Sequence, residues 1–178
     1  MQLQRISEEL EKQGYTTYMS KVNYFPFHIF SDRLTQYEMR MAMAFQFARH
    51  YLELIPNLEA QKVDWLLCDR HYICHLAFAA TYGLGWKEIE RLADIFRLGG
   101  TPDLTFYFDV PLEVSLDRIH NRKSKKIAED ETPEILGATL ENYQRIVRMN
   151  PTDPLVCIDA TDSVEIQTEQ ILRYISEL

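Results

Sequence analysis

The residues best suited to chemistry in this sequence are Asp69 and Arg70, which directly follow the short apolar segment 63–68. A carboxylate at the end of a buried strand can hold Mg²⁺ through oxygen or water. A neighbouring guanidinium offers a planar pair of donors to a phosphate. The competing interpretation is structural, with Asp69 capping the next helix and Arg70 pairing with a surface acid. The dipeptide alone does not decide between the two.

A second candidate is a basic cluster of five residues within nine positions of a chain whose net charge is −8. Such a cluster beside a sheet edge could clamp phosphates during transfer. Taken alone, it fits better with a solvated helix end, where the helix dipole favours cations. Its members are Arg118, Arg122, Lys123, Lys125 and Lys126.

The third candidate is the pair Phe45 and Arg49, which lie four residues apart and therefore on one face of a helix. A ring and a guanidinium together could stack on a nucleobase and hydrogen-bond to its edge. Taken alone, the pair is more commonly a core phenylalanine beside a surface arginine.

Two histidines four residues apart, His71 and His75, flank Cys74 and could suggest a metal site. The glutamate of a His-Glu-x-x-His motif is missing, and no third ligand is evident. Ordinary helix packing is the favoured interpretation of these residues.

Short apolar strands that alternate with helices must position these candidates. This alternation predicts an α/β fold with a parallel sheet and helical crossovers. Ligands bind at the carboxyl ends of such strands, where Lys21, Asp69, Asp109 and Asp159 lie. The expected strands are 15–19, 63–68, 104–108 and 155–158, and the last three are expected to be buried on both faces. The expected helices are 2–13, 34–55 (ended by Pro56), 72–81, 86–98, 111–121 (with Pro111 at the first helical position), 133–149 and 163–176.

Length and charge limit the function further. The 178 residues correspond to one ordinary domain, and the net charge of −8 argues against a nucleic-acid-binding surface. Three cysteines without metal-ligand spacing indicate a reducing, cytoplasmic setting. Charges interrupt every apolar stretch before the roughly 20 residues that a membrane span needs.

Taken in order, these residues resemble the thymidylate kinase family. The resemblance spans nearly the whole chain, and the two Asp-containing segments at 68–71 and 101–118 are its most specific parts. The matching segments are Ala44–Arg49, Cys68–His71, Leu76–Phe78, Thr101–Arg118, Asn142–Tyr143 and Ile158–Ala160.

The resemblance implies a single P-loop NTPase-like domain over residues 1–178, a three-layer sandwich with a parallel sheet. It implies phosphoryl transfer from ATP to dTMP with Mg²⁺, and it places a LID segment at about 119–132. It also allows a homodimer, as is usual in the family. The implied acceptor-side roles are phosphate binding by Arg70, thymine stacking by Phe45, base-edge bonding by Arg49, lining of the sugar side by Phe78 and a further substrate contact by Tyr143.

On the donor side, the resemblance places Arg118, Arg122, Lys123, Lys125 and Lys126 over ATP. It makes Asp69 the candidate Mg²⁺ ligand. Together with Arg70 and Arg118, Asp69 completes the implied catalytic set.

The chain departs from the family at its start, since the family's Gly-x-x-Gly-x-Gly-Lys-Ser/Thr loop is absent. No glycine precedes Gly14, and the family's central first strand is missing as well. We expect the natural protein to be longer than these residues. The alternative is a degenerate form whose gap is filled by rearrangement or by a partner.

Other departures put base selectivity in doubt. Lys21-Val22 stands where the family has an arginine and an acid. Cys74, His75 and Ala79 replace polar residues and a glutamine near the base.

The leading hypothesis is a dTMP kinase that is active in its full-length form, with these residues alone inactive. One alternative is a nucleotide-binding module without turnover. Another is a deoxynucleoside kinase, which the Asp69-Arg70 pair and segment 101–118 disfavour. The expected partners are small nucleotides, without nucleic acid or membrane.

Overall fold

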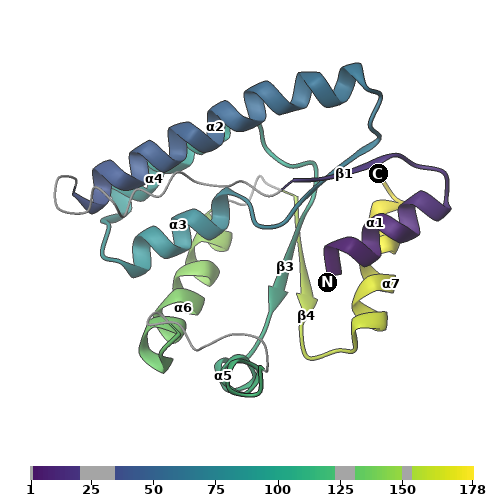
Figure 1. The fold of residues 1–178 in the computed structure, drawn as a ribbon. Helices are drawn as coiled ribbons and strands as arrows, with labels where there is room; N and C mark the ends of the chain where they lie inside the picture. Colours follow the sequence, from purple (N-terminus) through teal and green to yellow (C-terminus); the bar gives the residue numbers. More distant parts are fainter. Residues whose placement is uncertain (1, 21–34, 123–130, 150–153) are drawn as a thin grey trace. The chain divides into compact units, whose positions relative to one another are not determined.

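The computed structural model describes residues 2–20, 35–122, 131–149 and 154–178 (Figure 1). Its contacts divide the chain into two compact units, Met1–Thr101 and Pro102–Leu178. The single domain expected from the sequence therefore stays a prediction. Among the described helices, none has the length and apolarity to cross a membrane.

Within residues 2–20 and 35–101, the first unit has one pair of parallel strands and four helices. Strand β1 pairs with β2 so that Thr17 lies opposite Trp65 and Ser20 opposite Cys68. This pairing brings the carboxyl ends of both strands to one edge. The elements are α1 (Gln2–Lys12), β1 (Thr17–Ser20), α2 (Gln36–Ala60), β2 (Trp65–Cys68), α3 (Tyr72–Thr81) and α4 (Trp86–Arg97).

The core of the first unit lies where α2 and α4 run side by side (Figure 1). The buried positions of α2 recur at three- and four-residue intervals, as expected for one face of a helix. They meet buried residues of α4, and Phe47 packs edge-on against Phe96 at a centroid distance of 5.0 Å. The buried residues are Ala44, Phe47, Ala48 and Tyr51 on α2, and Ile89, Leu92, Ala93 and Phe96 on α4.

Helix α2 begins with a capping box and ends later than its sequence predicts. The Thr35 side chain accepts from the Glu38 amide, and the Glu38 carboxylate accepts from the Thr35 amide at 2.8 Å. The predicted end at Pro56 is wrong, because the helix continues to Ala60. An exposed proline costs one backbone hydrogen bond, and the buried Leu58 holds the last turn in place.

The described residues of the second unit, 102–122, 131–149 and 154–178, also contain one pair of parallel strands. In this pair, Thr105 lies opposite Leu155 and Asp109 opposite Asp159. Pro111 takes the N-cap position rather than the predicted first helical position. The elements are β3 (Thr105–Asp109), α5 (Leu112–His120), α6 (Pro133–Met149), β4 (Leu155–Asp159) and α7 (Val164–Ile175).

The predicted α/β class with parallel strands is confirmed, but the strands are less buried than expected. All four residues of β2 are half-buried, and the last two of β3 are exposed. Within the described residues, each strand has one neighbour, so the strands form two separate pairs. A strand with one paired edge keeps part of its surface open, which explains the difference.

Candidate functional site

The turn that follows β2 holds the sharpest candidate of the sequence. The Asp69 amide donates to the Ser20 carbonyl at 3.1 Å, which extends the strand pairing by one residue. Arg70 then adopts a φ of 68°, in the left-handed region that non-glycine residues rarely occupy. Such a conformation costs about 1–2 kcal/mol for a residue other than glycine, and strain of this kind clusters at functional sites.

Arg70 lies over an aromatic ring of α3. Its Cζ is 6.0 Å from the Phe78 centroid, within reach of a weak cation–π contact. The structural alternative for this turn is not supported, because the N-cap of α3 is His71 rather than Asp69. Among the described residues, Arg70 has no ion pair with an acid. Its exposed guanidinium is therefore available to an anion.

Phe45 and Arg49 share the outer face of α2. The Phe45 side chain is 53% exposed, so it is not a core residue. The Arg49 Nε donates to the Glu53 Oε1 at 2.8 Å, and both side chains are largely exposed. A base that stacked on Phe45 would compete with Glu53 for this guanidinium.

Arg40 is a residue that the sequence interpretation missed. It lies seven positions before Phe47 on the inner stripe of α2, and burial lowers its pKa. Its Cζ is 5.6 Å from the centroid of Tyr82, the C-cap of α3. The signal that could have found it is a charged residue in an otherwise apolar helix stripe.

His71, the N-cap of α3, and His75, within α3, both pack against aromatic rings. The His71 ring packs edge-on against Phe47 at 4.8 Å, and His75 stacks on Phe96 at 5.4 Å. Burial lowers the pKa of His71 to about 4. Burial, together with the charges of Arg40, His71 and Arg70, lowers the pKa of His75 to about 3. No group of three or more His, Cys, Asp or Glu side chains in the described part of the chain could hold a metal ion.

Cys68, at the end of β2, is not an activated thiol. The Tyr51 hydroxyl donates to its Sγ at 3.3 Å. Burial raises the pKa of the Cys68 thiol, so the reactive thiolate is disfavoured.

In the second unit, paired aspartates mark the carboxyl ends of the strands. Asp159 accepts hydrogen bonds from the Thr161 hydroxyl at 2.6 Å and amide at 2.8 Å, which lower its pKa. The Arg118 Nη2 donates to the Ala160 carbonyl at 2.7 Å. Arg118 is thereby tied to the end of β4, next to Asp159.

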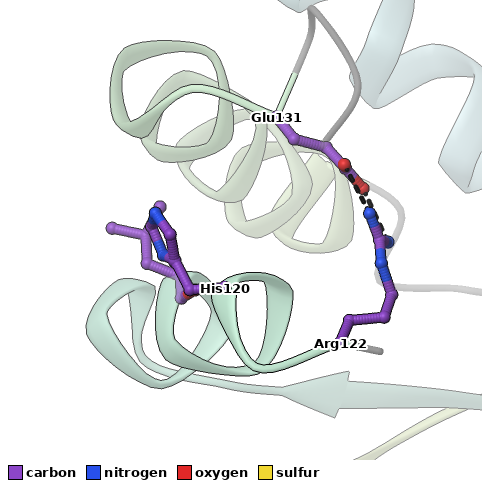
Figure 2. Close-up of polar contacts among 4 residues, drawn as sticks. His120, Arg122 and Glu131 are labelled. Carbon is purple, nitrogen blue, oxygen red and sulfur yellow. Dashed lines mark hydrogen bonds and ion pairs between the residues drawn. The ribbon is translucent and has the colours of Figure 1, made fainter. Parts of the chain in front are cut away.

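The rest of the predicted basic cluster is only partly described. Arg122 forms a two-pronged ion pair with Glu131, Nη1–Oε1 at 3.0 Å and Nη2–Oε2 at 2.8 Å (Figure 2). The nearby His120 instead bonds through Nδ1 to the Leu116 carbonyl of its own helix at 2.8 Å. Arg122 thus has a carboxylate partner where a phosphate partner was predicted. Lys123, Lys125 and Lys126 lie outside the described residues, as does Lys21.

The predicted site residues fall into both units. Tyr143 packs against Tyr107 of β3, with ring centroids 5.9 Å apart. Of the predicted acceptor-side residues, Phe45, Arg49, Arg70 and Phe78 lie in the first unit, and Tyr143 lies in the second. Asp69, the candidate Mg²⁺ ligand, also lies in the first unit. Arg118 and Arg122 of the predicted donor side lie in the second unit.

Comparison with protein families gives a match to the family described as Thymidylate kinase over residues 28–171. A probable thymidylate kinase of Thermococcus kodakarensis is 35% identical over 132 residues, which are 74% of this chain and 60% of that protein. A thymidylate kinase of Staphylococcus epidermidis is 32% identical over 144 residues, 75% of this chain and 69% of that protein. The chain therefore spans only 60–69% of the length of these two curated relatives.

A solved structure supports the fold. Deoxyadenosine kinase from M. mycoides, with its products dCMP and a flexible dCDP bound, aligns with a TM-score of 0.64 at 20% identity. The alignment covers 99% of this chain and 94% of that chain. This likeness confirms the predicted kinase fold class of the chain.

Proposed function

Because the chain belongs to the thymidylate kinase family, we propose that the protein transfers the γ-phosphate of ATP to dTMP, giving dTDP and ADP. An oxygen of the dTMP phosphate attacks the γ-phosphorus, and the bond from that phosphorus to the β–γ bridging oxygen breaks. Such transfer depends mainly on positioning and on charge stabilisation. The residues of this chain are proposed to supply both.

The observation that carries the proposal is the Asp69-Arg70 turn at the carboxyl end of β2. Arg70 is held at an unusual φ of 68°, and its guanidinium is exposed. We propose that it binds the acceptor phosphate, because guanidinium–phosphate hydrogen bonds are strong and directional. Phe78, under the same guanidinium, would line the sugar side of the site.

The base would bind at the outer face of α2. The exposed ring of Phe45 offers a stacking surface, and Arg49 would bond to the edge of the base after release from Glu53. Ala79, at a position where the family has a polar side chain near the base, is fully buried. It cannot offer a hydrogen bond there, so selectivity for thymine would depend more on Phe45 and Arg49.

On the donor side, Arg118 and Arg122 are proposed to face ATP, with Tyr143 as a further substrate contact. Arg122 must exchange Glu131 for phosphate oxygens to do so. Asp69 is a chemically suitable Mg²⁺ ligand, because it is an exposed carboxylate at a strand end. One carboxylate is enough when phosphates and water complete the shell, and bound Mg²⁺ would neutralise charge on the phosphates.

The 178 residues contain no Gly-rich loop with a lysine to hold the β- and γ-phosphates. We therefore expect dTMP binding without ADP release from these residues alone. A longer form that supplies such a loop should release ADP. We further propose that the protein acts in the cytoplasm, and that α2 supports a homodimer.

The test is calorimetric titration of dTMP into the purified chain and its Arg70→Ala variant, with ADP release assayed in the same samples. Loss of one charge-assisted contact worth about 1.5–3 kcal/mol should weaken dTMP binding by roughly 10- to 150-fold. The control is Arg91→Ala, an exposed arginine of α4 that should leave binding unchanged. A wild-type chain that is folded by circular dichroism yet binds no dTMP would refute the proposal.

A further inference from the structure

One face of α3 carries two aromatic rings with an arginine over each. Phe78 and Tyr82 are four residues apart, so they are neighbours on the helix surface. Arg70 reaches Phe78 from the turn after β2, with its Cζ 6.0 Å from the centroid. Arg40 reaches Tyr82 from α2, with its Cζ at 5.6 Å. Two guanidiniums from separate elements therefore converge on the same helix.

Within the described residues, neither Arg40 nor Arg70 forms an ion pair with an acidic side chain. Arg49, Arg122 and Arg173, by contrast, each pair with a glutamate. Arg40 is also partly buried, and burial lowers its pKa. A partly buried guanidinium without a counter-charge is costly unless an anion compensates it.

The charges of Arg40 and Arg70 both act on His75. His75 lies on α3 and stacks on Phe96 at 5.4 Å. Burial is the main cause of its low pKa, and Arg40 and Arg70 both lower that pKa further. His75 is thus within the electrostatic reach of both guanidiniums. Because it stays neutral, the positive charge of this surface comes from the two arginines.

We propose that Arg40 is a second anion-binding residue of the acceptor site, and that Arg40 and Arg70 together hold the dianionic phosphate of the nucleotide. This inference rests on the proposed function, for which Arg70 alone was assigned to the phosphate. Side chains four apart on a helix have Cβ atoms about 5–6 Å apart. Guanidiniums placed over such rings suit the opposite oxygens of one phosphate group. Two fixed positive charges also match the two negative charges of a phosphate monoester.

The consequence is a preference for nucleoside monophosphates over nucleosides. A nucleoside would leave both guanidiniums without a counter-charge, whereas a monophosphate supplies it. Tyr82 acts here as a positioning residue, since its ring holds the Arg40 side chain in place.

The experiment compares dTMP, thymidine and inorganic phosphate as titrants for the wild-type chain and Arg40→Met, which keeps the length and packing of the side chain. We expect Arg40→Met to weaken dTMP and phosphate binding about tenfold or more and to leave thymidine binding unchanged. The matched control is Arg97→Met. Arg97 also lies over a tyrosine, 5.8 Å from the Tyr72 centroid, but it pairs with Asp94 at 3.6 Å. The Arg97→Met variant should bind dTMP, thymidine and inorganic phosphate as tightly as the wild type does.

Each other outcome has a distinct meaning. If Arg40→Met binds dTMP as tightly as the wild type while Arg70→Ala does not, the inference is wrong and the proposed function stands. If Arg40→Met weakens thymidine as much as dTMP, Arg40 acts through packing and the inference fails. If inorganic phosphate binds and its binding needs both arginines, but dTMP does not bind, the anion site is supported and the proposed function is refuted. If Arg40→Met does not fold, Arg40→Lys replaces it, and it should retain part of the dTMP affinity.

Discussion

Buried histidines make the first unit sensitive to acid. His71 and His75 are packed among aromatic rings, and their pKa values fall to about 4 and about 3. An unfolded histidine titrates near pH 6.5. Below that pH the unfolded chain binds protons that the folded chain excludes, so the stability from these groups is fully present above about pH 6.5 and is lost as the pH falls.

The first prediction concerns His75→Gln. In the wild type, each histidine that is protonated only on unfolding lowers the free energy of unfolding by up to about 1.4 kcal/mol for each unit by which the pH falls. The variant should therefore lose less stability than the wild type between pH 6 and pH 4. Urea unfolding at several pH values measures this slope. His120→Gln, in the second unit, should leave the slope of the first unit unchanged, and an unaltered slope in His75→Gln would contradict the prediction.

Local spacing was enough to predict some site residues but not others. Asp69 and Arg70 are adjacent in the sequence and follow a strand, so their position could be inferred from pattern alone. The contact between Arg40 and Tyr82 joins residues 42 positions apart on different helices. It depends on how α2 packs against α3, which the periodicity of either helix does not specify.

At the scale of elements, the position of α2 against the end of α4 depends on a close contact between two backbone segments. Gly99, just after α4, is buried against α2. A Cβ at this position would lie 3.0 Å from the Ala48 Cα and 3.3 Å from the Tyr51 Cβ. The backbone of Ala48 cannot move aside without displacing its helix, so a methyl group at this position would strain the contact.

The second prediction follows for Gly99→Ala. Forcing a methyl group into this contact should lower the free energy of unfolding by about 1–3 kcal/mol. Gly137→Ala is the opposite case, because residue 137 lies inside α6 and a Cβ there would meet the Leu112 Cδ2 at 3.5 Å, an ordinary van der Waals distance. That variant should gain roughly 0.5–1 kcal/mol from helix propensity. Urea unfolding of both variants gives the comparison, and a stabilised Gly99→Ala would refute the packing argument.

The order and type of the elements could be predicted because each has a clear hydrophobic period and a breaker at its end. The exceptions have physical reasons. Pro56 was expected to end α2, but Leu58 is buried and extends the helix. The strand residues were expected to be buried on both faces from their apolar sequence. An apolar sequence cannot show how many neighbours a strand has, and each described strand has one.

At the scale of the whole molecule, the predicted roles follow the division of the chain. Four residues assigned to the acceptor nucleotide lie in Met1–Thr101, and the described residues assigned to ATP lie in Pro102–Leu178. Each unit keeps a parallel strand pair with acidic residues at or just after the carboxyl ends. This distribution predicts where binding of the acceptor should be felt along the chain.

The last prediction is a pattern of hydrogen exchange. A ligand at 100 times its Kd stabilises the folded protein by about 2.7 kcal/mol. Amides that exchange only through openings that release the ligand should therefore exchange about 100-fold more slowly. Saturating dTMP should therefore protect amides of α2 and α3, which carry Phe45, Arg49 and Phe78.

The control for this pattern is the Arg70→Ala variant, in which dTMP at the same concentration should slow exchange in α2 and α3 by only about 2- to 11-fold, because its binding is expected to be roughly 10- to 150-fold weaker. Thymidine, which lacks the phosphate, should protect the outer face of α2 more than the turn that holds Arg70. Protection confined to α5 and α7 would place the acceptor in the second unit. That result would overturn the assignment of Phe45 and Arg70 to the acceptor site. A nucleotide bound to these residues would have to slow exchange in α2 and in the turn after β2.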